Sequence, residues 1–172
     1  RVAVDLSPRV LGAARESAEG VVAADVDALP FAPSSFDAVT CFATLHHLYR
    51  FDTLAREVAR VLRPGGVFYS DHDLDAAFHR RFRAPLWVYR KVRSRKGAFA
   101  SSSGGLARGL YDLAEYHSKG IPADEVVRLL EGAGFAVEVG FHWFGLSGLF
   151  DRVFGDRSWR RGWAPLVAIV AT

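Results

Sequence analysis

Carboxylates follow two apolar segments near the start of this chain, and they could bind a nucleotide sugar. Asp5 ends an apolar run at residues 2–4, and Asp25 ends a second run at residues 21–24. A carboxylate at the tip of a strand can accept hydrogen bonds from both hydroxyls of a ribose. The alternative is that Asp5 caps the next helix and that Asp25 lies in a turn.

Histidines and further carboxylates follow the next two apolar runs. His46 and His47 come after residues 36–42, and an Asp-His-Asp triplet occupies positions 71–73. A histidine can take a proton from an acidic O–H, N–H or C–H group, so the candidate catalytic residues are His46, His47 and Asp71. We expect one of the two histidines only to cap its loop. We predict no metal site, because three adjacent residues of a strand cannot all face one ion.

Alternating strands and helices are predicted to position these side chains. Such alternation is typical of a parallel sheet covered by helices. The predicted elements are strands at residues 1–5, 21–25, 36–42, 67–70, 135–139 and 165–171 and helices at 8–18, 52–63 and 122–132. Pro64-Gly65-Gly66 should terminate the second helix, since proline cannot continue a helix and glycine accepts a positive φ. The last two strands should form an antiparallel hairpin.

Composition and length indicate one globular domain over residues 1–172. Half of the residues are apolar, the net charge is +3, and no apolar run approaches the ~18 residues that a membrane-spanning helix needs. The single cysteine, Cys41, excludes an internal disulfide and suits a reducing compartment. We therefore expect a cytoplasmic protein.

A basic, aromatic helical insert is predicted at about residues 74–110. Between positions 76 and 111 the chain has no acidic residue but has nine basic ones: Arg80, Arg81, Arg83, Arg90, Lys91, Arg93, Arg95, Lys96 and Arg108. Phe78, Phe82 and Leu86 recur at helical spacing, and Pro85 should kink or divide the helix. The insert could cover an acceptor pocket, contact anionic lipid head groups, bind nucleic acid, or simply extend the core.

Five motifs occur in order over the first 72 residues. They are Val4-Asp5-Leu6-Ser7-Pro8, Ala24-Asp25-Val26-Asp27-Ala28-Leu29-Pro30-Phe31, Phe36-Asp37-Ala38-Val39, Leu45-His46-His47-Leu48 and Arg60-Val61-Leu62-Arg63-Pro64-Gly65-Gly66. The series resembles the class I S-adenosylmethionine-dependent methyltransferases, in particular the type 11 group that includes ubiquinone/menaquinone C-methyltransferases. The resemblance implies an α/β, Rossmann-like fold whose sheet is mostly parallel and ends in an antiparallel hairpin.

The resemblance also implies a set of cofactor contacts. Asp5 would bind the ribose hydroxyls of S-adenosylmethionine, and Leu6 would pack on the adenosine. Asp25 would accept from the adenine amino group, the Val26 N–H would donate to the ring, and Phe42 would lie beside the cofactor. The family's first strand and its glycine-rich turn have no counterpart in this sequence. We therefore expect an N-terminally truncated domain that by itself binds S-adenosylmethionine weakly and is inactive.

The function predicted from this resemblance is methyl transfer from S-adenosylmethionine to a small, apolar or aromatic acceptor. Such an enzyme mainly aligns the two reactants and excludes water. The alternatives are an inert methyltransferase-like domain with a binding or regulatory role, and a nucleic-acid methyltransferase that uses the basic insert. The latter is disfavoured because no Asn/Asp-Pro-Pro-Tyr/Phe tetrapeptide follows residue 42. The expected partners are a small-molecule acceptor and, through the insert, a membrane surface.

Overall fold

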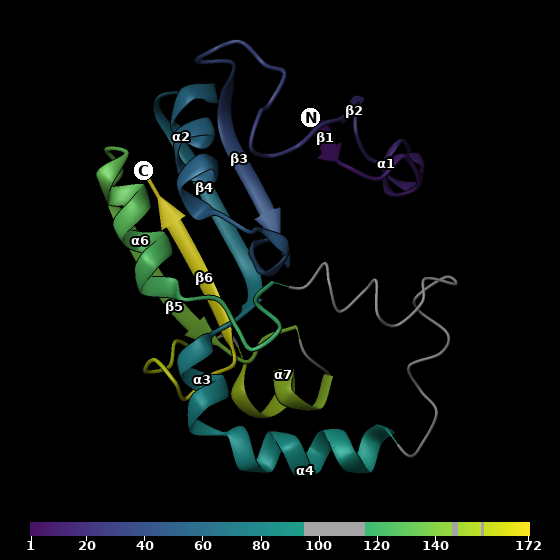
Figure 1. The fold of residues 1–172 in the computed structure, drawn as a ribbon, viewed down its shortest axis with the longest axis vertical. Coiled ribbons are helices and arrows are strands. Elements are labelled where there is room, and N and C mark those ends of the chain that lie inside the picture. Colours follow the sequence, from purple (N-terminus) through teal and green to yellow (C-terminus); the bar gives the residue numbers. More distant parts are fainter. Residues whose placement is uncertain (95–115, 146–147, 156) are drawn as a thin grey trace.

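The computed structural model of the protein describes residues 1–94, 116–145, 148–155 and 157–172, which form a mixed α/β structure (Figure 1). The strands are β1 (Val2–Asp5), β2 (Gly20–Ala23), β3 (Phe36–Phe42), β4 (Leu62–Leu74), β5 (Val137–His142) and β6 (Leu166–Ala171). The helices are α1 (Pro8–Ala14), the 3-10 helix η1 (Leu45–His47), α2 (Phe51–Val61), α3 (Ala76–Arg81), α4 (Arg83–Ser94), α6 (Ala123–Gly132) and α7 (Gly148–Phe154).

The described strands form two sheets rather than the single predicted one. β1 pairs in parallel with β2, and the second sheet has the order β3-β4-β6-β5. β3 and β4 are parallel, whereas β6 is antiparallel to both β4 and β5, which confirms the predicted terminal hairpin. β1, β2 and α1 form a separate group beside β3 in Figure 1. Asp5 and Phe42 therefore end strands of different sheets.

The core lies between the four-stranded sheet and the helices α2 and α6. Leu54 and Val58 of α2 pack in one buried cluster with Val126 and Leu130 of α6 and with Phe68 of β4, which has no exposed surface. The apolar residues of α2 recur every three or four positions, so they form one stripe along the helix that faces the sheet. This packing fixes β3 and β4, whose carboxyl ends carry the candidate residues.

The Pro64-Gly65-Gly66 motif lies inside β4, so its prediction as a helix terminator is wrong. α2 already ends at Val61, and the Leu62 N–H donates to the Val58 carbonyl. Leu62 then pairs with Phe36, and the next pair joins Val67 to Ala38, so the motif is an irregularity in the strand. β4 continues to Leu74. The sequence had indicated that the triplet at 71–73 follows the strand. In the structure the triplet is part of β4.

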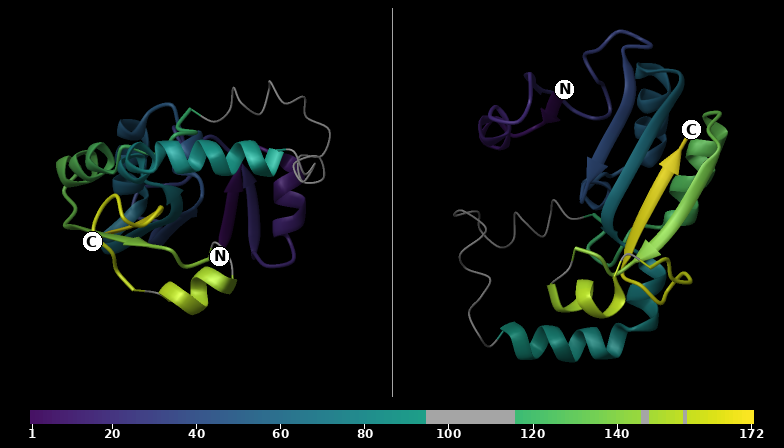
Figure 2. Two further views of the ribbon diagram at one scale, coloured as in Figure 1. Left: turned by 90° about the horizontal axis from the view of Figure 1, so that it is seen from below. Right: turned by 180° about the vertical axis from the view of Figure 1, so that it is seen from behind.

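The predicted insert begins with two helices that lie beyond the carboxyl end of β3, together with α7 (Figures 1 and 2). The chain divides at Phe82, and Pro85 does not cause the division, because it lies in the first turn of α4. A proline is tolerated there, since the first turn has no intrahelical partner for its missing N–H. Positions 95–110 of the predicted insert lie outside the described residues. None of the described helices is long and apolar enough to cross a membrane.

Asp75 begins α3 by capping it. Its carboxylate is fully buried, and Oδ2 accepts the Phe78 N–H at 3.1 Å. The replacement Asp75→Ala should destabilise the fold by about 1 kcal/mol, because a buried N–H would lose its acceptor. Urea unfolding checks this. Asp75→Asn keeps a capping oxygen and should restore most of the loss; equal effects of the two replacements would contradict the capping role.

Candidate active site

His46 and the buried Asp73 form a hydrogen-bonded pair at the carboxyl ends of β3 and β4. Asp73 was not among the candidate catalytic residues predicted from the sequence. Its side chain has no exposed surface, and its Oδ1 lies 2.7 Å from His46 Nδ1. Because a carboxylate can only accept, Nδ1 carries the hydrogen of this bond. Nε2 is then the basic nitrogen of the neutral ring, and it faces away from Asp73.

The same carboxylate also holds the backbone of η1. Asp73 accepts the N–H groups of Leu45, at 3.1 Å, and of His46, at 3.0 Å. Three donors therefore surround Asp73, which compensates for removing its charge from water. Asp73 of β4 therefore holds η1 through two backbone N–H groups as well as through the His46 imidazole. The His46–Asp73 pair is called the dyad below.

The backbone that joins β3 to η1 is strained next to the dyad. Ala43 and His72 have positive φ values of 48° and 67° although neither is a glycine. The two segments are in contact, since the Ala43 N–H donates to the Asp71 carbonyl at 2.8 Å. Residues held in such conformations cost about 1–3 kcal/mol each and tend to cluster at functional sites. The strain supports a functional role for this end of the sheet.

Asp71, a candidate base, is fully engaged by neighbouring donors. Its Oδ2 accepts the Tyr69 hydroxyl at 2.7 Å, and its Oδ1 lies 2.7 Å from His142 Nε2 and accepts the His72 N–H at 2.6 Å. Burial disfavours the charged carboxylate, but these hydrogen bonds outweigh it and lower the pKa of Asp71. The same contact, aided by burial, raises the pKa of Tyr69 to about 12. This geometry favours a positioning role for Asp71 over proton transfer.

An aromatic surface adjoins this network. The Phe42 side chain is 54% exposed, and its ring centroid lies 5.6 Å from that of Tyr69 and 5.9 Å from that of His72. Gly145 packs against His72 so closely that a Cβ atom would collide with the His72 Nε2. The exposed Phe42 ring, with Tyr69 and His72 beside it, is a surface that suits an apolar or aromatic ligand.

The other catalytic candidate, His47, is exposed beside the dyad. Its ring centroid lies 3.9 Å from that of His46. Cys41 is also near Asp73, but burial raises the pKa of its thiol to about 12, so the thiol is not a nucleophile. Among the described residues, no group of three or more His, Cys, Asp or Glu side chains could hold a metal ion.

The predicted cofactor residues of the first sheet also lie together. Asp5 pairs with Ala23 in the β1–β2 register, which places Asp5 and Asp25 at the same end of this sheet. Asp5 Oδ1 accepts the Ser7 N–H at 2.7 Å, and Asp25 Oδ1 accepts the Asp27 N–H at 3.0 Å. The Asp25 contact is the turn of the alternative interpretation, whereas Asp5 bonds the N–H of Ser7, which precedes α1, and caps no N–H of the helix itself. Each uses one carboxylate oxygen, so the other oxygen can still accept a ligand hydroxyl or amino group.

The side chains that follow these two acids differ in exposure. Leu6 is 70% exposed, as a residue that packs on a ligand can be, whereas Val26 is partly buried against the core. No hydrogen-bonded strand pair within the described chain joins this group to Phe42, His46 and Asp71. The predicted site residues are therefore brought together in two groups.

Comparison with known proteins identifies the first part of the chain. A family described as a methyltransferase domain matches residues 1–70. The predicted family is thereby confirmed, and the matched region contains β1, β2, β3 and η1 with the dyad histidine.

Curated relatives of the methyltransferase domain match over similar segments. A demethylmenaquinone methyltransferase of Mycobacterium marinum is 46% identical over 65 residues, which are 38% of this chain and 28% of that protein. A fatty-acid O-methyltransferase of Mycolicibacterium smegmatis is 51% identical over 51 residues, 29% of this chain and 19% of that protein. The aligned segment thus spans less than a third of each relative's length.

Solved structures show that the whole chain shares the fold. A Thermotoga maritima protein described as an S-adenosylmethionine-dependent methyltransferase, possible histamine N-methyltransferase, superposes with a TM-score of 0.65 at 18% identity. The superposition covers 100% of this chain and 72% of that one. An S-adenosylmethionine-dependent methyltransferase of Mesorhizobium loti gives 0.58 at 20% identity, covering 99% of this chain and 78% of that one. The α/β methyltransferase fold predicted from the sequence is confirmed.

Proposed function

We propose that this methyltransferase domain transfers a methyl group from S-adenosylmethionine to an apolar or aromatic acceptor, with His46 as the general base. The observation that carries this proposal is the His46–Asp73 dyad at the carboxyl ends of β3 and β4. Ligands bind outside these ends in open α/β sheets. The exposed Phe42 ring beside Tyr69 supplies the apolar surface for the acceptor.

The chain's own residues account for the proton that the acceptor loses. When bound, S-adenosylmethionine supplies a methyl group on a positively charged sulfur, whose charge is lost in the transfer. His46 Nε2 removes the proton from the attacking O–H, N–H or C–H group while that group's electron pair becomes available to the methyl carbon. Asp73 then stabilises the protonated imidazole, because it is already hydrogen-bonded to Nδ1.

The donor side of the proposal uses the residues at the ends of β1, β2 and β3. Asp5 and Asp25 each keep an oxygen for the ribose and the adenine amino group, and the exposed Leu6 can pack on the adenosine. The Val26 N–H would donate to the adenine ring, and Phe42 would lie beside the cofactor. The family match over residues 1–70 supports this assignment, since it includes all five positions.

Replacing Asp5 with asparagine should weaken S-adenosylmethionine binding about tenfold. Asparagine still provides an oxygen for the Ser7 N–H, so the turn before α1 is kept, but the charged acceptor for the ribose is lost. Calorimetric titration of the protein encoded by the complete reading frame measures the dissociation constant. Glu16→Gln, which removes an exposed carboxylate after α1, is the matched control. Equal affinities for both variants would contradict the ribose contact.

A methyl-transfer assay with labelled S-adenosylmethionine tests the proposed activity. The names of the curated relatives suggest quinol and fatty-acid acceptors, and a phenol series extends the aromatic class. We expect transfer to at least one of these three classes. The absence of transfer to all of them, with cofactor binding intact, would instead support an inert methyltransferase-like domain.

A further inference from the structure

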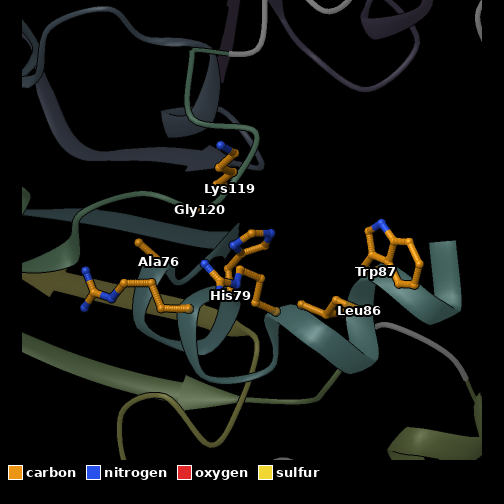
Figure 3. A pocket seen from close by; sticks show the side chains of 8 residues that line it. Ala76, His79, Leu86, Trp87, Lys119 and Gly120 are labelled. Carbon is orange, nitrogen blue, oxygen red and sulfur yellow. The ribbon is translucent and has the colours of Figure 1, made fainter. Parts of the chain in front are cut away.

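A basic pocket of about 700 Å³ lies between α3, the start of α4 and the segment at 119–120 (Figure 3). Its described lining consists of Ala76, His79, Arg80, Arg83, Leu86, Trp87, Lys119 and Gly120. In Figure 3, Lys119 and Gly120 lie on one side of the pocket, and His79 and Trp87 project from the two helices on the other. A pocket of this size can hold a single small amphiphile.

The lining has a surplus of positive charge. Arg80, Arg83 and Lys119 are all exposed, and none of the described lining residues is acidic. The exposed carboxylate nearby, Asp124, is already hydrogen-bonded to Arg161. Burial lowers the pKa of His117, so the histidine that precedes this segment adds no charge at neutral pH. The pocket therefore suits an anion.

One wall of the pocket is apolar. Leu86 is partly buried, and Trp87, one position further along α4, is 61% exposed. A large exposed indole beside a cationic surface suits a ligand that joins an acidic group to an alkyl or aromatic body.

The pocket is connected to the dyad through the backbone. The His117 N–H donates to the His46 carbonyl at 3.0 Å, and two residues later Lys119 lines the pocket. Two residues span at most about 7 Å. The segment is fixed at its other end, because the Ile121 N–H donates to Leu74 and the Ile121 carbonyl accepts from Ala76. A ligand in the pocket therefore lies near the reacting end of the domain.

We propose that this pocket binds the anionic head group of an amphiphilic acceptor, a carboxylate or a phosphate carried on an apolar body. That the ligand is the acceptor rests on the proposed function; that the pocket binds an anion does not. The shared chemistry is a compact oxyanion held by Arg83 and Lys119, with the apolar body against Trp87.

Calorimetry on the protein from the complete reading frame tests the binding step. The probes are laurate, dodecyl phosphate and the uncharged dodecanol, each below its micellar concentration. We expect one of the two anions to bind at least tenfold more tightly than dodecanol, and the tighter of the two identifies the head group. Arg83→Gln and Lys119→Gln should each weaken that binding about tenfold, whereas Arg15→Gln, after α1, should leave it unchanged. Equal binding of dodecanol, or no effect of either pocket variant, would overturn the proposal.

Vesicle binding and methyl-transfer assays distinguish this proposal from a membrane-surface contact and from the proposed function. Binding to phosphatidylglycerol vesicles without binding to monomeric laurate or dodecyl phosphate would replace the pocket by a membrane-surface contact. Methyl transfer to a neutral quinol that is insensitive to Arg83→Gln, with no transfer to any acid, would overturn the acceptor assignment and leave the proposed function standing. Anion binding with no methyl transfer to any acceptor would refute the proposed function and leave the pocket as an anion site.

Discussion

Replacing His46 with glutamine should lower the kcat of methyl transfer by a factor of about 10² to 10⁴, the usual contribution of a general base. Glutamine can still donate a hydrogen bond to Asp73, but its amide cannot take a proton from the acceptor. The KM for the acceptor should change little, because the interaction is gained as the proton moves. Steady-state assays with labelled S-adenosylmethionine measure both constants.

The pH profile distinguishes this role from a structural one. A general base must be unprotonated to act, so the unaltered enzyme should lose activity on the acidic side of its profile, and His46→Gln should lose that limb. Asp73→Asn should reduce kcat as well, because it changes the hydrogen bonding of the ring that Asp73 positions. His47→Gln provides the comparison between the two candidate histidines. A larger fall in kcat at His47 than at His46 would show that the wrong histidine has been assigned.

The second large effect is on stability and concerns Gly120, which lines the basic pocket. Gly120→Ala should destabilise the fold by about 2 to 6 kcal/mol, which combines the cost of an unfavourable φ with that of overpacking. Gly120 has a φ of +100°, and a Cβ there would lie 2.6 Å from the Ala76 nitrogen and 2.7 Å from the Asp75 carbonyl carbon. Neither backbone atom can move aside without disturbing the start of α3. Urea unfolding gives the free energy.

Gly132 in α6 is the matched control for this replacement. No heavy atom lies within 4 Å of a Cβ built at Gly132, so alanine there should be neutral or stabilising by up to about 1 kcal/mol. If Gly120→Ala and Gly132→Ala had the same stability, the close approach of the 119–121 segment to α3 would be wrong.

The sequence predicted the strands and helices whose ends are set by residues close to them in the chain. Residues 36–42 form β3 with the predicted bounds, and α2 follows from apolar residues at helical spacing. The helix after Asp5 was predicted to reach residue 18 but ends at Ala14, because the N–H groups of Glu19 and Gly20 donate to the Arg1 carbonyl. Pro64-Gly65-Gly66 was misassigned for a similar reason, since the pairing of Leu62 with Phe36 is a long-range contact.

The candidate site was predicted in part. His46 was selected because it follows a strand, but its partner Asp73 lies 27 residues away and was considered only as part of a metal triplet. The signal that could have identified Asp73 is that β3 and β4 are parallel neighbours, so polar residues near their carboxyl ends meet. The basic pocket could not be predicted in full, because Lys119 is placed beside α3 by long-range contacts such as the pairing of Asp75 with Ile121.

The three hydrogen bonds to Asp73 limit how η1, which carries the proposed base His46, can move. Rotating η1 so that the ring leaves the carboxylate would also break the bonds from the Leu45 and His46 N–H groups. The backbone that carries the proposed base is therefore held in place. Acceptors of different shape would then be accommodated by the helices α3 and α4 and not by movement of the backbone at position 46.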